Sequence, residues 1–252
     1  MPSSAAVHGS KARLLLSGWD ISPSMRGGSF PSSVDLADSS TWGMTSKRYT
    51  SSDRVEANFA GDGVWEAAAP GLGSIDELLG VTVGAAHVAS YLPQGGAFGS
   101  RGRLIGGTES AFEVTSPGDD VTGFSFELAS TLGVVPNARV LIPLTGTLGI
   151  TAAGNGTALD DLGGAPAVPT LKGIGAAIHI INKGGSAGNI TLRVQHSPDN
   201  SVWTDIIVFA AKTLIHQYEY LEAPGTVNRY LRAIWTLTAG TSWDVSVVAG
   251  RK

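Results

Sequence analysis

One serine stands in a pattern that hydrolytic enzymes use. Residues 184–188 read G-G-S-A-G, which matches the G-x-S-x-G motif of a serine presented on a sharp turn between a strand and a helix. Here the segments on both sides alternate apolar and polar residues, so both are predicted as strands. A hydrolase would also need a histidine and an acid beside Ser186, for which His216 and Asp199 are the only candidates. The missing helix therefore favours a hairpin turn, and we expect no enzymatic activity.

Metal-binding patterns are absent from the sequence. The histidines are His8, His87, His179, His196 and His216, without the spacing of zinc motifs. His179 lies in an apolar segment and is expected to be a hydrogen-bonded core residue. The pairs Asp119-Asp120 and Asp160-Asp161 lack the alternating ligand loop of calcium sites and are expected in turns or at strand edges. Without cysteine there is no thiol nucleophile or disulfide, so we expect no metal and no cofactor.

Alternating apolar and polar residues dominate the chain and predict strands with one buried and one exposed face. Clear examples are Phe124, Phe126 and Leu128, which alternate with Ser125 and Glu127. Clusters of Gly, Pro, Asn and Asp between such segments are typical of turns. The sequence predicts a mainly β protein built from antiparallel sandwiches or barrels.

A single helix is predicted over residues 74–80. Ser74 can cap its N-terminus, Glu77 completes a capping box, and Gly80 follows the last turn. We expect this short amphipathic helix to pack on the N-terminal β domain.

Composition divides the chain into two parts. Residues 146–170 are rich in Gly, Ala and Pro and are expected to be a linker with at most one strand inside it. Residues 1–145 would form a β-sandwich or barrel with the helix, and residues 171–252 an antiparallel β-sandwich, which can include a strand from the linker. We expect the second domain to be separable; the alternative is one core shared by both.

Residues 38–53 are the other irregular stretch. They carry Trp42, Met44 and Tyr49, which are large side chains in a segment without strand alternation. Such segments in compact domains are usually functional or interfacial. We expect these three residues to make contacts between subunits.

Charge and hydropathy exclude several classes of protein. Charged residues make up 15% of the 252 residues, the net charge is −4 and the mean hydropathy is +0.13. These values argue against a disordered chain and give no basic footprint for nucleic acid. The sequence shows no secretion signal and no apolar segment long enough to span a membrane. We therefore expect a soluble protein that is made and folded in a cytoplasm.

The chain resembles the tail tube proteins (major tail proteins) of long-tailed, non-contractile bacteriophages that infect actinobacteria. The segments that carry the resemblance are 14–22, the stretch to Tyr49, 55–60, 74–80 and 113–121 in the N-terminal half, and 194–205 and 223–232 in the C-terminal half. The resemblance implies hexameric rings that stack into a hollow tube for DNA ejection. Its implied partners are other copies of the chain, the tape-measure protein and DNA in the lumen, and the tail terminator and distal tail proteins. The implied location is the virion tail, assembled in the host cytoplasm, with an acidic balance that suits a lumen through which DNA slides.

A carbohydrate-binding or adhesion protein is the alternative. Trp203, Trp235 and Trp243 all lie in predicted strands of the C-terminal part, and aromatic side chains can stack on sugars. The same domain on a tail tube would lie outside the tube, where it could contact host surface glycans. The alternation of Trp235 and Trp243 with apolar neighbours favours core positions for these two.

Overall fold

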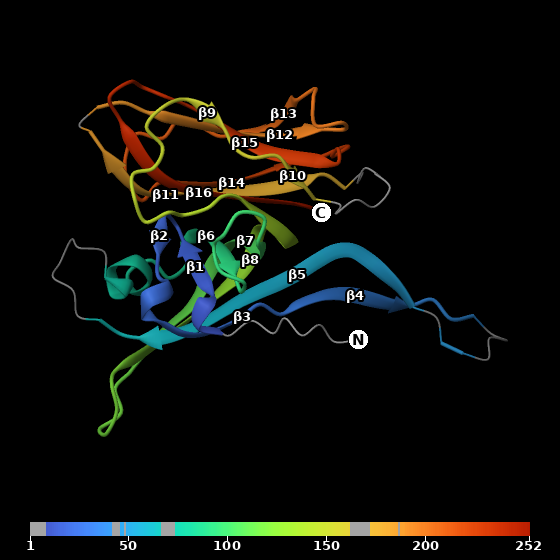
Figure 1. The fold of residues 1–252 in the computed structure, drawn as a ribbon. Coiled ribbons are helices and arrows are strands. Elements are labelled where there is room, and N and C mark those ends of the chain that lie inside the picture. Colours follow the sequence, from blue (N-terminus) through green and yellow to red (C-terminus); the bar gives the residue numbers. More distant parts are fainter. Residues whose placement is uncertain (1–8, 42–45, 48, 67–73, 162–171, 186) are drawn as a thin grey trace.

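The computed structural model describes residues 9–41, 46–47, 49–66, 74–161, 172–185 and 187–252. Its strands form two antiparallel sheets (Figure 1). The larger sheet has eleven strands from both halves of the chain, and the smaller sheet has five and packs on the C-terminal part of the larger one. The protein is therefore mainly β, which confirms the predicted fold class.

The strands fall into two sequential groups. The N-terminal half contributes β1 (Arg13–Leu16), β2 (Trp19–Asp20), β3 (Met25–Ser29), β4 (Ser32–Asp38), β5 (Tyr49–Val64), β6 (Ala86–Leu92), β7 (Arg101–Thr115) and β8 (Gly123–Ile142). The C-terminal half contributes β9 (Gly154–Asn155), β10 (Leu159–Asp160), β11 (Ile174–Gly184), β12 (Ile190–Ser197), β13 (Thr204–Val208), β14 (Tyr218–Ala223), β15 (Tyr230–Leu237) and β16 (Ser242–Arg251). Two short 3-10 helices, η1 (Gly9–Lys11) and η2 (Ser22–Ser24), precede β1 and β3.

Strand β8 shows how alternation in the sequence builds the N-terminal core. Phe124, Phe126 and Leu128 are buried, whereas Ser125 and Glu127 between them are exposed. These buried side chains pack with others from β1, β5 and β7 in one apolar cluster. The period of two therefore predicts both the strand and its buried face.

The predicted helix is present as one π-helical turn, η3 (Asp76–Gly80). The Glu77 N–H donates to the Ser74 Oγ at 3.2 Å, as the capping box predicts. Ile75 and Leu79 are 5% and 0% exposed and anchor the turn on the N-terminal core. Gly80 lies inside the turn instead of beyond it, so its predicted place is wrong by one residue position.

The C-terminal half is a sandwich of two sheets. Strands β14, β11 and β16 form one layer, and β10, β15, β12 and β13 form the other, with β9 also paired to β15. Trp243 is fully buried between the layers, as predicted for a core residue, together with apolar side chains from both sheets. Leu141 and Ile142 at the end of β8 belong to the same cluster, so the N-terminal half contributes to this core.

The described part of the expected linker is built into this sandwich. Strands β9 and β10 both lie within residues 146–170, and Ile150 exchanges two backbone hydrogen bonds with Trp243, at 3.0 and 2.9 Å. A Cβ on Gly154 would lie 3.2 Å from the Trp235 ring, so the small residue lets the backbone pass close to the sheet. The expectation of at most one strand is wrong, because the small residues serve close packing here.

The two halves meet along a contact that we call the seam. Strand β16 pairs with β11 on one side and with β8 on the other, so a single backbone ladder crosses from half to half. A Cβ on Gly250 would lie 2.6 Å from the Ala138 Cα, so the close approach of β16 to β8 requires glycine here. The division into residues 1–145 and 171–252 stays a proposal.

Buried apolar side chains from both halves form a shared cluster at the seam. It contains Leu15, Val88, Leu92, Leu104, Val135, Ala138 and Val140 from the N-terminal half, and Ala177 and Val248 from the C-terminal half. Asp161 adds a polar link, because Arg139 of β8 and Arg251 of β16 approach its carboxylate at 3.4 and 2.8 Å. The seam thus has the packing of a domain interior.

Within the described residues, no helix is long and apolar enough to cross a membrane.

Candidate functional site

A two-stranded ribbon leaves the body of the protein, and we call it the first arm (Figure 1). Its strands are β4 and the first part of β5, which pair from Ser32↔Ala57 to Asp38↔Tyr49. The body begins at Asn58, where β5 starts to pair with β8. Among the described residues, the first arm therefore has no third strand along its length.

Apolar side chains on the first arm are open to solvent. Leu36 and Tyr49 are 62% and 55% exposed, and the cross-strand pair Val34 and Val55 is about 40% exposed on each side. Val34 lies opposite Val55 in the ladder, and Leu36 lies two residues further along β4, beyond a register shift. An exposed apolar patch of this kind usually marks a contact with another protein.

The predicted contact residues are only partly placed. Tyr49 lies at the outer end of the first arm, opposite Asp38, as the first residue of β5. Residues 49–53 are thus part of a strand, which corrects the expectation of an irregular segment up to residue 53. Trp42 and Met44 lie outside the described residues.

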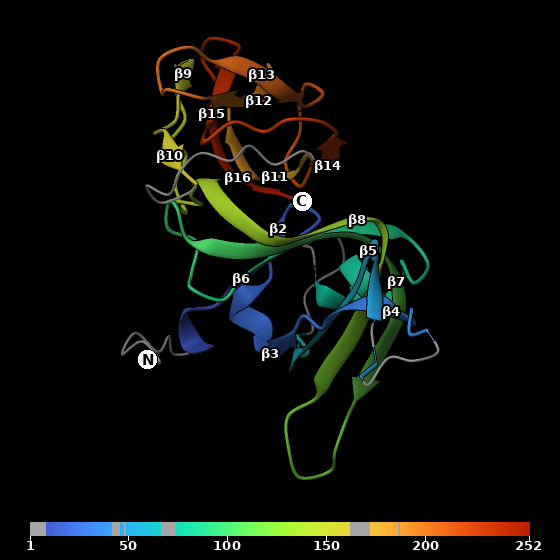
Figure 2. The same cartoon turned by 90° about the vertical axis from the view of Figure 1, so that its right-hand side faces the viewer.

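A second projection is the turn between β7 and β8, which we call the acidic tip (residues 116–122; Figure 2). It carries Asp119 and Asp120, and Val121 is 50% exposed. A hydrogen bond of 3.1 Å between the Ser116 and Thr122 hydroxyls closes its base. The predicted turn position of Asp119 and Asp120 is therefore confirmed.

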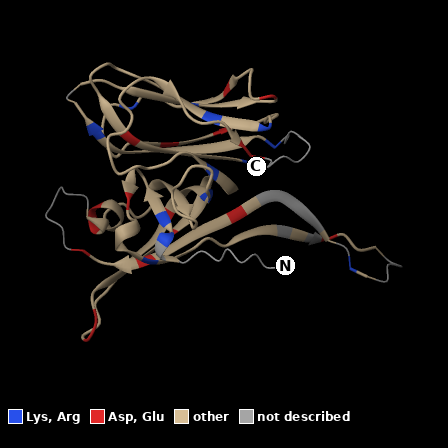
Figure 3. Ribbon diagram, in the orientation of Figure 1, with Lys and Arg blue, Asp and Glu red and all other residues tan. Residues whose placement is uncertain are grey.

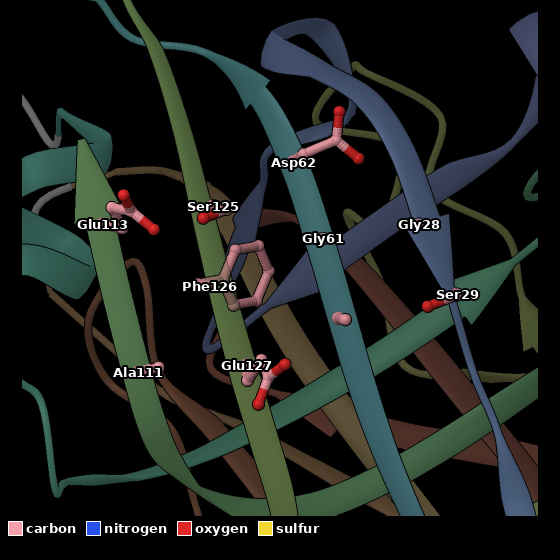
Figure 4. Close-up of a pocket in the computed structure, with 10 residues that line it drawn as sticks. Gly28, Ser29, Gly61, Asp62, Ala111, Glu113, Ser125, Phe126 and Glu127 are labelled. Atoms are coloured by element: carbon pink, nitrogen blue, oxygen red, sulfur yellow. The ribbon is translucent and has the colours of Figure 1, made fainter. Parts of the chain in front are cut away.

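Next to the acidic tip, the N-terminal sheet has an open acidic face. A shallow pocket of about 430 Å³ lies on strands β3, β5, β7 and β8. Asp62, Glu113 and Glu127 stand around it on three neighbouring strands, between small residues (Figure 4). Gly61 leaves room behind this face, because a Cβ there would lie 2.7 Å from the Phe126 ring. Among the described residues, no His, Cys, Asp and Glu side chains are grouped to hold a metal ion.

The seam buries a histidine with its hydrogen bonds satisfied. His179 on β11 is 0% exposed, and its Nδ1 accepts the Gly18 N–H at 3.3 Å. Its Nε2 therefore carries the ring proton and donates to the Ser90 Oγ at 2.8 Å. Burial lowers the pKa of His179 to about 3, so the ring is neutral at pH 7. The predicted role of His179 as a core residue is confirmed.

A stacked pair of rings lies beside this histidine. Trp19 of β2 and His216 are parallel within 2°, with ring centroids 3.3 Å apart. The His216 Nδ1 lies 3.0 Å from the Gly18 carbonyl oxygen. Gly18 has φ +83°, and a Cβ there would lie 2.6 Å from the His216 backbone. The turn between β1 and β2 is therefore shaped to receive His216 from the C-terminal half.

Ser17, His87 and Glu109 form a buried network that sequence patterns did not indicate. The Ser17 Oγ lies 2.8 Å from the His87 Nδ1, and the His87 Nε2 lies 3.3 Å from the Glu109 Oε2. Thr82 donates to the same carboxylate oxygen at 3.1 Å. Burial lowers the pKa of His87 and raises the pKa of Glu109, so both tend toward neutral forms.

The order of groups in this network is that of a serine, histidine and acid relay, but its position is not that of a catalytic site. Ser17 is 3% exposed, and its Oγ also accepts the Val88 N–H at 3.4 Å. A catalytic serine needs an open approach for the substrate. The network instead ties the turn after β1 to β6 and β7. No local signal could reveal it, because Ser17 and His87 are 70 residues apart.

The two candidate partners of the predicted serine motif are engaged in other contacts. Ser186 is outside the described residues, between β11 and β12, which belong to different sheets. The motif therefore lies on a connection between sheets, and the expected hairpin is wrong. Asp199 accepts the Ser201 and Val202 N–H groups of its own turn, which lowers its pKa, whereas His216 lies at the seam.

The tryptophans of the C-terminal half do not form a shared sugar-binding platform. Trp243 is buried, and the Trp235 indole N–H donates to the Ala152 carbonyl at 2.9 Å. The Arg232 guanidinium covers the Trp203 ring at 4.2 Å from its centroid. Each indole is thus engaged within the chain, which removes the observation that motivated the carbohydrate-binding alternative.

No protein-family model and no curated protein matches the chain. Among solved structures, it is similar to a chain of the virion of the native gene transfer agent (GTA) particle, at 12% identity and a TM-score of 0.40, covering 51% of this chain and 97% of that chain. It is also similar to a chain of the tail of the empty GTA particle, with C6 symmetry, at 12% identity and a TM-score of 0.41, covering 52% of this chain and 98% of that chain. A third similar structure is the SPP1 Dit (gp 19.1) protein, from the hub adsorption apparatus of phages that infect Gram-positive bacteria. Its sequence identity is 10% and its TM-score 0.35, and the match covers 93% of this chain and 98% of that chain. At TM-scores below 0.5, these likenesses carry no conclusion about the function of this chain.

Proposed function

We propose that this chain is a structural protein of a phage tail and that it works by associating with copies of itself. The first arm carries the proposal, because it presents exposed apolar side chains on a ribbon of only two strands. A two-stranded hairpin is marginally stable in water by itself. A neighbouring subunit on the first arm would cover these side chains and stabilise the ribbon.

The finer proposal is a tail tube made of stacked, hexameric rings, as the sequence resemblance implies. The acidic face around Asp62, Glu113 and Glu127 supports a surface turned toward DNA, because carboxylates repel phosphates and let DNA pass without binding. The tape-measure protein, the tail terminator and the distal tail protein are the further partners that this proposal includes. The proposed location is the tail of the virion.

A structural role is also consistent with how the reactive groups are held. Ser17, His87 and Glu109 are closed off from solvent, and His179 is fully bonded at the seam. These groups stabilise contacts within the chain. We therefore propose a protein without enzymatic activity.

The test is the state of the purified full chain over a concentration series, followed by sedimentation velocity and negative-stain electron microscopy. We expect reversible growth from single chains to rings, and then to short tubes. The proposal would be contradicted by a chain that stays monomeric at every concentration and is present in a single copy in each virion.

A further inference from the structure

We propose that the acidic tip of one copy docks on the outward face of the five-stranded sheet of the next copy. This inference rests on the proposed self-association and names one of its contacts. The acceptor is the face of β12, β13 and β15 that points away from the sandwich core, which we call the outer face. The docked element is the acidic tip, residues 116–122.

The outer face carries a row of polar side chains that are held in fixed positions. The Arg232 Nε donates to the Gln195 Oε1 at 2.9 Å, and the Gln195 Nε2 donates to the Asp205 Oδ1 at 2.6 Å. Arg193 donates to the other Asp205 oxygen at 3.2 Å. The Trp203 ring supports the Arg232 guanidinium from one side. The row is therefore preorganised, so little side-chain entropy would be lost on binding.

The charge of this row is complementary to the acidic tip. Within the row, Arg193 and Arg232 bring two positive charges against the one negative charge of Asp205. Arg193 keeps 40% of its side chain exposed. Among the described residues, Arg232 uses only its Nε for its hydrogen bond, which goes to Gln195. The terminal guanidinium nitrogens can thus donate to an arriving carboxylate. Asp119 and Asp120 supply two carboxylates side by side.

Apolar side chains accompany the charges on both surfaces. Val208 lies opposite Arg193 in the ladder and is 53% exposed, and Val202 in the preceding turn is 67% exposed. Val121 in the acidic tip is 50% exposed, and Val114 on β7, just before the tip, is 41% exposed. Contact between the two sets would remove apolar surface from water, which supplies affinity in addition to the charge pairs.

The two surfaces lie at opposite ends of the molecule. The sheet of β12 and β13 is at the top in both Figure 1 and Figure 2, and the turn between β7 and β8 is at the bottom in both. Figure 3 shows acidic colour at this lower turn, and both basic and acidic colour on the upper strands. The acidic tip therefore cannot contact the outer face of its own copy. A head-to-tail contact of this type propagates from copy to copy.

A charge exchange tests the docking with the full chain. The face variant carries Arg193→Glu and Arg232→Glu, and the tip variant carries Asp119→Lys and Asp120→Lys. In each variant alone, tip and face have the same sign, so we expect self-association at least about tenfold weaker than in the wild type, as for other interfacial charge pairs. In an equimolar mixture each tip meets a face of opposite sign, so we expect association to return with alternating copies.

A control variant with Arg26→Glu and Arg101→Glu has the same change in net charge at exposed positions of the N-terminal half. We expect it to associate more strongly than the face variant. Wild-type association with no loss in either variant would overturn the docking and leave the proposed function standing. Loss in both variants without recovery in the mixture would also overturn it. A wild-type chain that never associates would overturn both proposals.

Discussion

The seam and the first arm differ in which groups they leave without partners. At the seam, polar groups such as His179 and Ser90 are buried, and each finds its hydrogen bond inside the chain. On the first arm, apolar groups such as Leu36 and Tyr49 remain in contact with water. Most buried polar groups in proteins are hydrogen-bonded, and a patch of exposed apolar groups usually marks a contact with another protein.

This difference assigns separate tasks to the two regions. The seam is complete within one chain, so changes there alter the stability of the fold. The first arm is the proposed contact between copies, so we expect changes there to alter association and leave the fold intact. The predictions below separate the two effects by measuring stability and association on the same variants.

Removal of the C-terminal half should have the largest effect. Truncation after Pro143 deletes the partners of Leu15, Val88 and Val140, which are 0–3% exposed in the full chain. Each such side chain contributes about 1.5–3 kcal/mol through burial. We expect the truncated chain to be insoluble, or to lose cooperative unfolding in a thermal melt followed by circular dichroism. A soluble fragment that melts cooperatively and forms tubes would show instead that the first half is independent.

Charges on the first arm should abolish association without unfolding the chain. Leu36→Asp with Tyr49→Asp places two carboxylates on the exposed apolar patch, and we expect self-association to fall by about 100-fold, as for hot-spot residues. The free energy of unfolding should change by less than about 0.5 kcal/mol per substitution, because both sites are exposed. Sedimentation velocity and urea denaturation measure the two quantities.

The matched control is Val81→Asp with Val83→Asp, which changes two side chains that are 75% and 54% exposed outside the first arm. We expect this control to associate like the wild type. Equal loss of association in both double variants would contradict a specific role for the first arm.

Loss of the seam histidine should destabilise the fold and spare association. His179→Leu leaves the Gly18 N–H and the Ser90 hydroxyl buried without their partner, which costs about 3 kcal/mol in total. For a chain of this length we expect the melting temperature to fall by about 9 °C. Folded His179→Leu protein should still form the wild-type assemblies. An unchanged melting temperature would show that water or other groups replace the histidine.

The same histidine should make stability depend on pH. Its pKa is lowered from 6.5 to about 3 in the folded chain, so between these values the unfolded chain binds more protons. Stability should therefore fall as the pH falls from 6.5 toward 3, by up to about 1.4 kcal/mol per pH unit. Burial acts in the same direction on His87 and His196, and in the opposite direction on Glu109. The free energy of unfolding of the wild type and of His179→Leu, measured by urea denaturation at pH 6.5 and 5, isolates the contribution of His179. The same change with pH in both proteins would contradict the neutral burial of His179.

Loss of the ring stack should have the smallest effect. Trp19→Leu removes the parallel contact with His216 but keeps an apolar side chain at the edge of the seam. We expect a loss of about 1 kcal/mol in the free energy of unfolding, which is typical of an aromatic pair. Association should be unchanged. A drop as large as that of His179→Leu would show that the stack contributes as much to the stability of the seam as the buried histidine does.

Local patterns were sufficient for strands such as β8 and for the one predicted helix. The alternation around Phe126 predicts both β8 and its buried face, and the Ser74 to Glu77 spacing predicts the cap of η3. The glycines of residues 146–170 led to the wrong prediction of a linker with at most one strand. Small residues suit a flexible linker and also a backbone that packs closely on a sheet. Only the packing of Gly154 on Trp235 distinguishes the two.

The sites were predictable only where one segment contains the whole signal. The size and context of Tyr49 predict a contact between subunits, which stays a prediction, whereas the extent of β5 depends on pairing with β4 and was missed. The seam could not be predicted, because His179 meets Ser90 and Gly18 across 89 and 161 residues of sequence. Contacts of that kind arise from the topology of the sheet and leave no local pattern.

Hydrogen exchange followed by mass spectrometry, on single chains and on assemblies of the same preparation, tests the central claim most directly. The account predicts that assembly slows exchange in the first arm, residues 32–38 and 49–57, and leaves the seam strands β11 and β16 unchanged, because these are already protected in the single chain. Unchanged exchange in the first arm, together with new protection at the seam on assembly, would contradict the account.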